Sequence, residues 1–183
     1  MRSKRHVLAA FAAAVTLVVV VVGVLVARGT GPAQPVATPS ASGGADDRGA
    51  AVSFAGRDVA TGNAVALADF RGKPVVVNIW ASWCPGCNAE ARALGEFAKA
   101  HPEAAFVGVN FQDSESAARA FYERYRWTFP SVYDPDGEIA YELALQGTPT
   151  TIFLDRAHRE VTRIVGETDE QGFAQGLAAA TRP

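Results

Sequence analysis

Two cysteines separated by two residues are the feature of this sequence with the clearest chemistry. Cys84 and Cys87 are the only cysteines in a chain of 183 residues. A pair at this spacing can alternate between a disulfide and two thiols, which is the basis of thiol–disulfide exchange. The apolar run at 75–80 is typical of a buried strand, and apolar residues at helical spacing follow the cysteines. We therefore expect the pair where a strand ends and a helix begins.

The start of the expected helix favours Cys84 as the attacking thiol. The first N–H groups of a helix have no partner within the helix, and the helix dipole is positive at that end. A thiolate at Cys84 is stabilised there, so its pKa is expected to fall. Cys87, one turn further on, would then be the resolving thiol. Pro85 suits the first turn, where its missing N–H costs nothing, and Gly86 leaves room for another chain to approach.

Two other uses of the cysteine pair fit the sequence less well. A purely structural disulfide would close a loop so short that it stabilises the fold little. A closed zinc site needs four ligands, and the only histidines, His6, His101 and His158, are all remote from the pair in the sequence. We therefore expect redox chemistry and no metal site.

The elements that must position the cysteines follow the N-terminal segments. Hydrophobic residues make up 49% of the sequence and charged residues 20%, with a net charge of −2. About 130 residues remain for a folded part, enough for one domain with a substantial core. Because there is neither a net positive charge nor a basic stripe, we expect no nucleic-acid partner.

Composition divides the chain into three segments. Residues 1–28 combine early basic residues with an uncharged run long enough to span a bilayer, and they predict an N-terminal signal-anchor. The alternative is a cleaved signal peptide, which would leave a secreted protein. Residues 29–50 predict a flexible linker, and residues 51–183 predict the folded domain. The basic residues before the apolar run place this domain outside the cytoplasm, in a single-pass protein of the cell membrane.

Strand and helix patterns alternate along the domain. The predicted strands lie at 75–80, 104–111, 131–133, about 150–155 and 160–165. The predicted helices begin at the cysteines, ending near 101, and lie at 114–127, 138–145 and 169–180, with Gly147 expected to stop the third. This alternation implies a parallel crossover and an α/β fold.

The stretch at 72–87, GKPVVVNIWASWCPGC, resembles the active-site strand and helix of the thioredoxin superfamily. The stretch GTPT at 147–150 adds to the resemblance, which covers roughly 52–180. Within the superfamily, the chain is similar to the membrane-tethered TlpA, ResA and DsbE-like group. The resemblance implies a thioredoxin-like fold with a central mixed sheet flanked by helices, and the extra strand–helix insertion of that group.

The resemblance also implies roles for residues outside the cysteine pair. Pro149 would follow a cis peptide bond beside the cysteines, and the backbone of Thr148 would pair with an extended segment of the substrate. Glu90 would tune the protonation of the cysteines. The alternative for Glu90 is an ordinary acidic residue early in a helix, favoured there by the dipole.

Two other positions near the pair carry expectations. We expect Trp80 and Trp83 to pack around the site as a hydrophobic collar, with Trp83 partly exposed to a partner. Asn78 stands where plain thioredoxin carries an aspartate, and an asparagine cannot act as a base. We expect Asn78 to be a hydrogen-bonded amide in the core.

The resemblance implies an enzyme that exchanges disulfides with the thiols or disulfides of exported proteins and needs no cofactor. As a reductase it would take electrons from a membrane redox partner and reduce apocytochrome c or other exported proteins. As an oxidase, like some DsbE relatives, it would insert disulfides instead. An alternative of another class is a membrane-tethered copper-binding metallochaperone. We expect the protein to act as a monomer.

Overall fold

The structure, a computed structural model, describes residues 49–182. The signal-anchor predicted for 1–28 lies outside the described residues, as does almost all of the linker predicted for 29–50. Within 49–182, no helix combines the length and the apolar character needed to cross a membrane.

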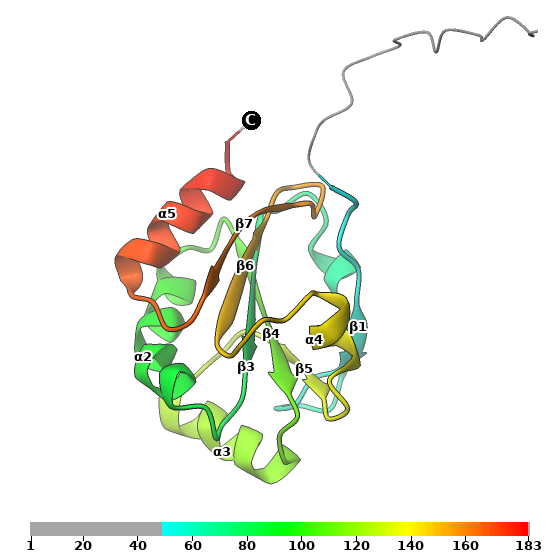
Figure 1. The fold of residues 1–183 in the computed structure, drawn as a ribbon, viewed down its shortest axis with the longest axis vertical. Helices are drawn as coiled ribbons and strands as arrows, with labels where there is room; N and C mark the ends of the chain where they lie inside the picture. The colour runs from blue at the N-terminus through cyan, green and yellow to red at the C-terminus, as the bar shows by residue number, and fades with distance from the viewer. Residues whose placement is uncertain (1–48, 183) are drawn as a thin grey trace, which may run out of the picture. The chain divides into compact units, whose positions relative to one another are not determined.

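A five-stranded mixed sheet forms the centre of the domain (Figure 1). In spatial order its strands are β5 (Ser131–Asp134), β4 (Ala105–Phe111), β3 (Val75–Trp80), β6 (Thr150–Leu154) and β7 (Glu160–Val165). β3, β4 and β5 are parallel, whereas β6 runs antiparallel to both β3 and β7. The parallel crossover and the mixed sheet are therefore as predicted.

The central strand β3 is apolar on both sides because each face of the sheet is covered. Val76 and Trp80 enter one hydrophobic core. Val75, Val77 and Ile79, at the alternate positions, enter the opposite core. A strand buried on both faces reads as a continuous apolar run, which is why the sequence located β3 correctly.

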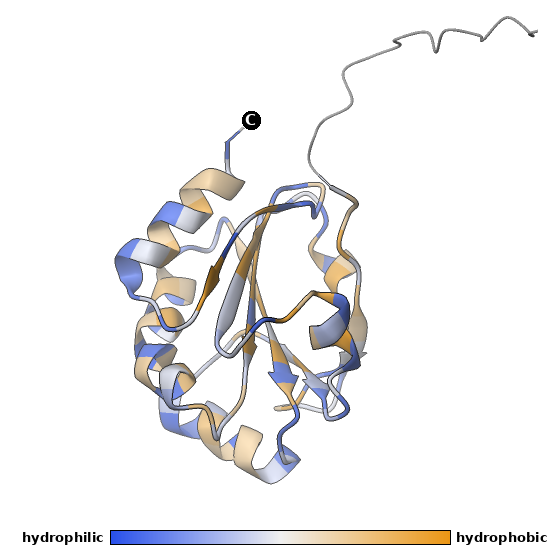
Figure 2. Cartoon of the chain, viewed as in Figure 1, coloured by the Kyte–Doolittle hydropathy of each residue, from blue (hydrophilic) through white to orange (hydrophobic). Residues whose placement is uncertain are grey.

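Three long helices cover one face of the sheet, and smaller elements cover the other (Figure 1). The long helices are α2 (Pro85–Ala100), α3 (Glu115–Tyr125) and α5 (Glu170–Ala180). The smaller elements are the hairpin of β1 (Ala55–Arg57) and β2 (Ala64–Ala66), the 3₁₀ helix η1 (Leu67–Phe70) and α4 (Glu138–Glu142). Figure 2 shows hydrophilic and hydrophobic residues mixed along the long helices, as expected for helices with one buried side.

The predicted helix starts hold, whereas one helix end does not. Ser114 caps α3, its side chain accepting a hydrogen bond from the backbone N–H of Ala117. The helix predicted for 138–145 ends at Glu142, so Gly147 does not stop it. The backbone leaves helical geometry at Ala144, whose φ is 54°. Between α2 and Pro149 the chain forms β4, α3, β5 and α4, so this region contains the additional strand and helix that the resemblance implied.

Candidate active site

Cys84 and Cys87 form a disulfide where β3 gives way to α2. Cys84 is the N-cap residue of α2, and its sulfur accepts a 3.1 Å hydrogen bond from the backbone N–H of Cys87. Pro85 is the first residue of the helix, as expected. Both cysteines are buried, with 2% and 1% of their surfaces exposed. The two sulfurs differ in position rather than exposure, because only that of Cys84 lies at the N-cap, where a thiolate is stabilised.

Pro149 lies against the start of α2. The Thr148–Pro149 peptide bond is cis, as the resemblance implied. A Cβ built on Gly86 would lie only 3.0 Å from Cδ of Pro149, so a side chain there would push the two segments apart. The lack of a side chain at Gly86 therefore lets Pro149 lie close to α2, in addition to leaving room for another chain, as the sequence suggested.

Trp83 is the exposed aromatic residue of the site, with 56% of its surface accessible. Its indole N–H donates a 3.1 Å hydrogen bond to the carbonyl of Gln112, which holds the ring over the loop after β4. Trp80 is fully buried and donates to Oγ of Ser131. Of the two tryptophans, only Trp83 offers a partner an apolar surface.

Glu90 is buried in a polar network rather than solvated on the helix surface. One carboxylate oxygen accepts from Nδ2 of Asn78 at 2.9 Å, and the other accepts from the backbone N–H of Thr168 at 3.0 Å. Burial raises the pKa of Glu90 to about 7, although these two hydrogen bonds lower it and the nearby Glu167 adds to the rise. Only 2% of Glu90 is exposed, so its carboxylate is shielded from bulk solvent within the fold.

Asn78 is the hydrogen-bonded core amide that the sequence suggested, although its side-chain oxygen has no hydrogen-bond partner. Its Nδ2 donates to Glu90 and, at 3.0 Å, to Oγ1 of Thr151. Its Oδ1 is buried without a hydrogen-bond partner. Asn78 thus helps to fix the position of the Glu90 carboxylate.

Asp113, just after β4, supports the cysteine loop and was missed by the sequence analysis. Its carboxylate accepts from the backbone N–H and Oγ of Ser82 at 2.6 and 2.8 Å. It also accepts from Nδ2 of Asn110 and the backbone N–H of Ser114. Residues that follow neighbouring parallel strands meet at one edge of a sheet, and this rule could have identified Asp113.

The segment after β7 also reaches the site and was missed. The backbone N–H of Gly166 donates to the carbonyl of Pro149 at 2.8 Å, and the N–H of Thr168 donates to Glu90. The register of the β6–β7 pair, which sets Thr150 opposite Val165, places this segment beside Pro149. Extending the predicted pairing of these two strands by one residue would have placed the segment after β7 at the site.

Two hollows differ in their relation to the cysteines. One is lined by Ala89, Glu90, Glu167, Thr168 and Asp169, so it opens the Glu90 network to solvent.

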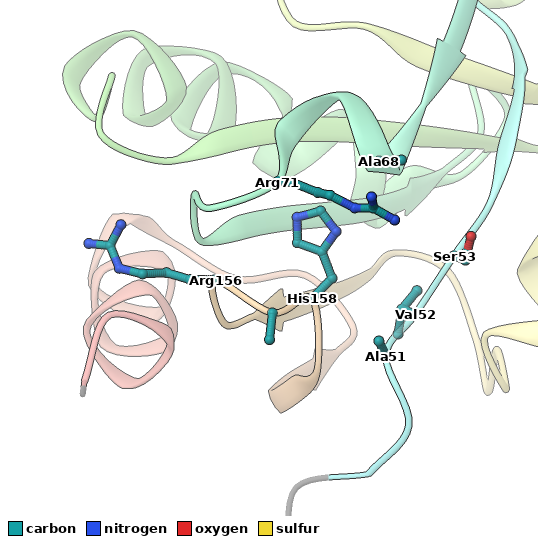
Figure 3. A pocket seen from close by; sticks show the side chains of 8 residues that line it. Ala51, Val52, Ser53, Ala68, Arg71, Arg156 and His158 are labelled. Atoms are coloured by element: carbon teal, nitrogen blue, oxygen red, sulfur yellow. The ribbon is translucent and has the colours of Figure 1, made fainter.

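The other hollow, in Figure 3, lies by the β6–β7 turn. It is lined by Ala51, Val52, Ser53, Ala68, Arg71, Arg156, Ala157 and His158. The side chain of Arg156 extends away from Arg71 and His158, so the charges do not converge. Within 49–182, no group of three or more His, Cys, Asp or Glu side chains is arranged to hold a metal ion.

Comparison with known proteins assigns the chain to a protein family. The family model described as Redoxin matches residues 48–177, which is more than half of the sequence. The chain belongs to the Redoxin family. That assignment and the geometry of the cysteine pair agree with the thioredoxin-like fold implied by the sequence.

Relatives of this Redoxin-family chain include proteins of thiol–disulfide exchange. The chain is 33% identical over 113 residues to the thiol:disulfide interchange protein DsbE of Pseudomonas fluorescens biotype C, a match of 61% of this chain and 62% of the relative. It is 36% identical over 86 residues to the soluble secreted antigen MPT53 of Mycobacterium tuberculosis, covering 47% and 50% of the two chains. The matches thus span about half to three fifths of these relatives.

A solved structure supports the same assignment. The crystal structure of a DsbF homologue from Corynebacterium diphtheriae superimposes with a TM-score of 0.68 at 29% identity. The superposition covers 77% of this chain and 95% of the other. The thioredoxin-like fold and the resemblance to the DsbE-like group are therefore confirmed.

Proposed function

We propose that this chain is an extracytoplasmic thiol–disulfide oxidoreductase that exchanges disulfides with exported proteins through Cys84 and Cys87. The observation that carries the proposal is the disulfide at the N-terminus of α2, set beside the cis Thr148–Pro149 bond. Helix N-termini stabilise thiolates, and an edge of free backbone at Thr148 can pair with an extended substrate. Trp83, Pro85 and Gly86 provide the surface around that edge.

In the reductive direction the reaction starts from the two thiols. The Cys84 thiolate attacks a substrate disulfide, forming a mixed disulfide and releasing one substrate thiolate. Cys87 loses its proton, with the Glu90 carboxylate as the base that lies three residues on, and attacks the sulfur of Cys84. The second substrate thiolate leaves. The substrate gains two electrons and two protons, and the protein is left with the disulfide seen in the structure.

Two carboxylates near the pair favour this reductive direction. The segment 81–91 contains no lysine or arginine, and Glu90 and Glu167 lie on the same side of the site. Negative charge destabilises the thiolate, and the strongest disulfide oxidants owe their potential to a stabilised reduced form. We therefore propose a reductase, recharged by a dithiol of a membrane redox partner. Apocytochrome c is a substrate that the resemblance suggests.

The proposed location follows from the sequence and is supported by the secreted antigen among the relatives. The charged and apolar pattern of 1–28 favours a membrane anchor, with the domain on the outer side. Cleavage of that segment would instead release a secreted enzyme with the same active site.

The reduction potential of the Cys84–Cys87 pair tests the direction. The reduction potential of thioredoxin is ~−270 mV and that of the strong oxidant DsbA is ~−120 mV, and ~30 mV changes the equilibrium tenfold. We expect a value near the thioredoxin end, measured by equilibration with glutathione or dithiothreitol. A value near that of DsbA would reverse the direction and make the protein a disulfide donor.

The mixed disulfide tests the exchange itself. Cys87→Ala should accumulate a covalent complex with substrate proteins, because the resolving thiol is missing. Cys84→Ala should form none. Equal trapping by both variants would contradict the assignment of Cys84 as the attacking sulfur.

A further inference from the structure

Glu167 stands between two anchored backbone positions at the edge of the active site. Gly166 donates to the carbonyl of Pro149 at 2.8 Å, and Thr168 donates to the carboxylate of Glu90 at 3.0 Å. The residue between these two hydrogen bonds is therefore held in a fixed place, although it lies in a loop between β7 and α5.

The side chain of Glu167 lies over the cysteine loop. A Cβ built on Gly86 would come within 3.4 Å of a Glu167 carboxylate oxygen and 3.5 Å of its Cβ, and within 3.0 Å of Cδ of Pro149. Gly86, Pro149 and Glu167 thus converge on one spot. A substrate that reaches Cys84 along Thr148 must pass next to this carboxylate.

The carboxylate of Glu167 is exposed and carries an uncompensated charge. It has no hydrogen bond or ion pair among the described residues, in contrast to Glu115 and Glu160, which pair with arginines. The active-site segments 81–91, 145–150 and 165–172 contain no lysine or arginine. A fixed charge that the protein does not neutralise is available to a partner.

We propose that Glu167 is a specificity-determining residue that favours substrates carrying lysine or arginine next to the reacting cysteine. The inference rests on the proposed function and adds the charge of the preferred substrate to it. A cationic side chain beside the substrate cysteine meets the Glu167 carboxylate in the encounter complex, whereas an acidic side chain there is repelled. Since Glu167 is solvent-exposed, the effect is a several-fold preference that salt weakens.

The test compares peptide disulfides that differ only in the residue after the cysteine, which is lysine or glutamate. The reduced full-length protein is assayed for kcat/KM with each peptide, and the ratio of the two values is taken. The neighbouring residue also changes the cysteine pKa of the peptide, but that effect is the same for every protein variant. The change of the ratio between variants therefore reports the protein alone.

We expect Glu167→Gln to lower the lysine-to-glutamate ratio by about threefold at low salt, and Glu167→Lys to lower it further. Glu167→Asp should keep most of the wild-type ratio. The matched control is Glu96→Gln, which removes the same charge from an exposed position on α2 away from the site and should leave the ratio unchanged. At ~0.5 M salt the wild-type and Glu167→Gln ratios should converge.

Two results would overturn the inference, and they are distinguishable. If the wild type reduces the peptides but Glu167→Gln has the wild-type ratio at low salt, Glu167 does not set specificity and the proposed function stands. If the wild-type protein exchanges disulfides with neither peptide, both the proposed function and this inference are wrong.

Discussion

Glu90 and Asn78 form a buried hydrogen-bonded pair, in which Asn78 positions the carboxylate and Glu90 can ionise. Asn78 holds the carboxylate through Nδ2, and burial raises the pKa of Glu90 to about 7. A carboxyl group with this pKa exists in both protonation states near neutral pH, which suits the proton transfer from Cys87 that we propose. The hollow beside Glu90 provides the path to water.

The raised pKa of Glu90 predicts a pH dependence of stability. The folded protein binds a proton at Glu90 up to about pH 7, whereas the unfolded chain releases it near the ordinary value of 4.5. Between these values the folded state holds more protons, so the free energy of unfolding falls as pH rises, by about 3 kcal/mol in total. Above pH 7 no further loss is expected from this group.

Urea unfolding of the oxidised protein between pH 5 and 8 checks this dependence. Glu90→Gln, which cannot ionise, should show a flatter profile over that range. Glu123→Gln, an exposed change on α3, serves as the control and should follow the wild type. A Glu90→Gln profile as steep as that of the wild type would show that another group is responsible.

Residues near the cysteines were predictable where the chemistry is local in sequence. The cysteine pair, Pro85 and the exposed Trp83 are recognised from one short stretch. The burial of Glu90 was not predictable, because it depends on Asn78 and Thr168, which are distant in sequence. Asp113 was missed for the same reason, because it follows β4 whereas its partner Ser82 follows β3.

Trp127 helps to hold the helix α2 in place, in addition to the contacts at the end of α2 that carries the cysteines. The indole N–H of Trp127 donates to the carbonyl of Ala91 at 2.7 Å, and Gly95 lies beneath the ring. Trp127 also packs edge-on against Trp80 of β3. The absence of a side chain at Gly95 thus allows an aromatic ring to lie close to the helix.

Gly95→Ala is expected to destabilise the fold in spite of the better helix propensity of alanine. The new methyl would lie 2.9 Å from Cδ1 of Trp127, and overpacking costs about 1–3 kcal/mol. The gain from replacing a helical glycine is at most ~1 kcal/mol, so a net loss of roughly 1 kcal/mol follows.

Thermal or urea unfolding measures the effect of Gly95→Ala, with Gly147→Ala as the control. A methyl at Gly147 meets nothing closer than 4.0 Å and should change stability little. Disulfide exchange by folded Gly95→Ala should stay near the wild-type rate, because the changed contact lies two turns past the cysteines. A more stable Gly95→Ala would mean that Trp127 moves aside without cost.

Which segments form helices and which form strands followed from the apolar periodicity, but the end of α4 did not. Strands β3 and β4 and the helices α2 and α5 lie within one or two residues of their predicted positions. The end of α4 was misplaced because Ala144 adopts a positive φ, a conformation that alanine does not signal. At that helix end Arg163 of β7 donates to the carbonyls of Leu143 and Ala144, a contact distant in sequence.

At the scale of the whole molecule, the redox state and the stability are linked. The disulfide closes a very short loop, and for such a loop the chain-entropy relation gives a stabilisation of only roughly 2 kcal/mol, the low end for disulfides. We expect the oxidised protein to be more stable than the reduced protein by about that amount. A reductase proposed to end its cycle as a disulfide would therefore end it in its more stable form.

Unfolding curves with and without dithiothreitol measure this difference at one pH. A double variant, Cys84→Ser with Cys87→Ser, should have the same stability in oxidant and in reductant, close to that of the reduced wild type. Equal stability of the two redox forms of the wild type would contradict the linkage.

The arrangement of the ends of the domain has a practical consequence. Ala51 bridges to Arg159 at the β6–β7 turn, and α5 runs from the Glu90 side back toward that same end, where the C-terminus lies (Figure 1). The strands of the sheet, at ~3.3 Å per residue, separate that end from the cysteines by roughly 15–20 Å. A bead, a fluorescent reporter or a fused enzyme attached at either end would thus stand behind the reacting sulfurs and leave their approach clear.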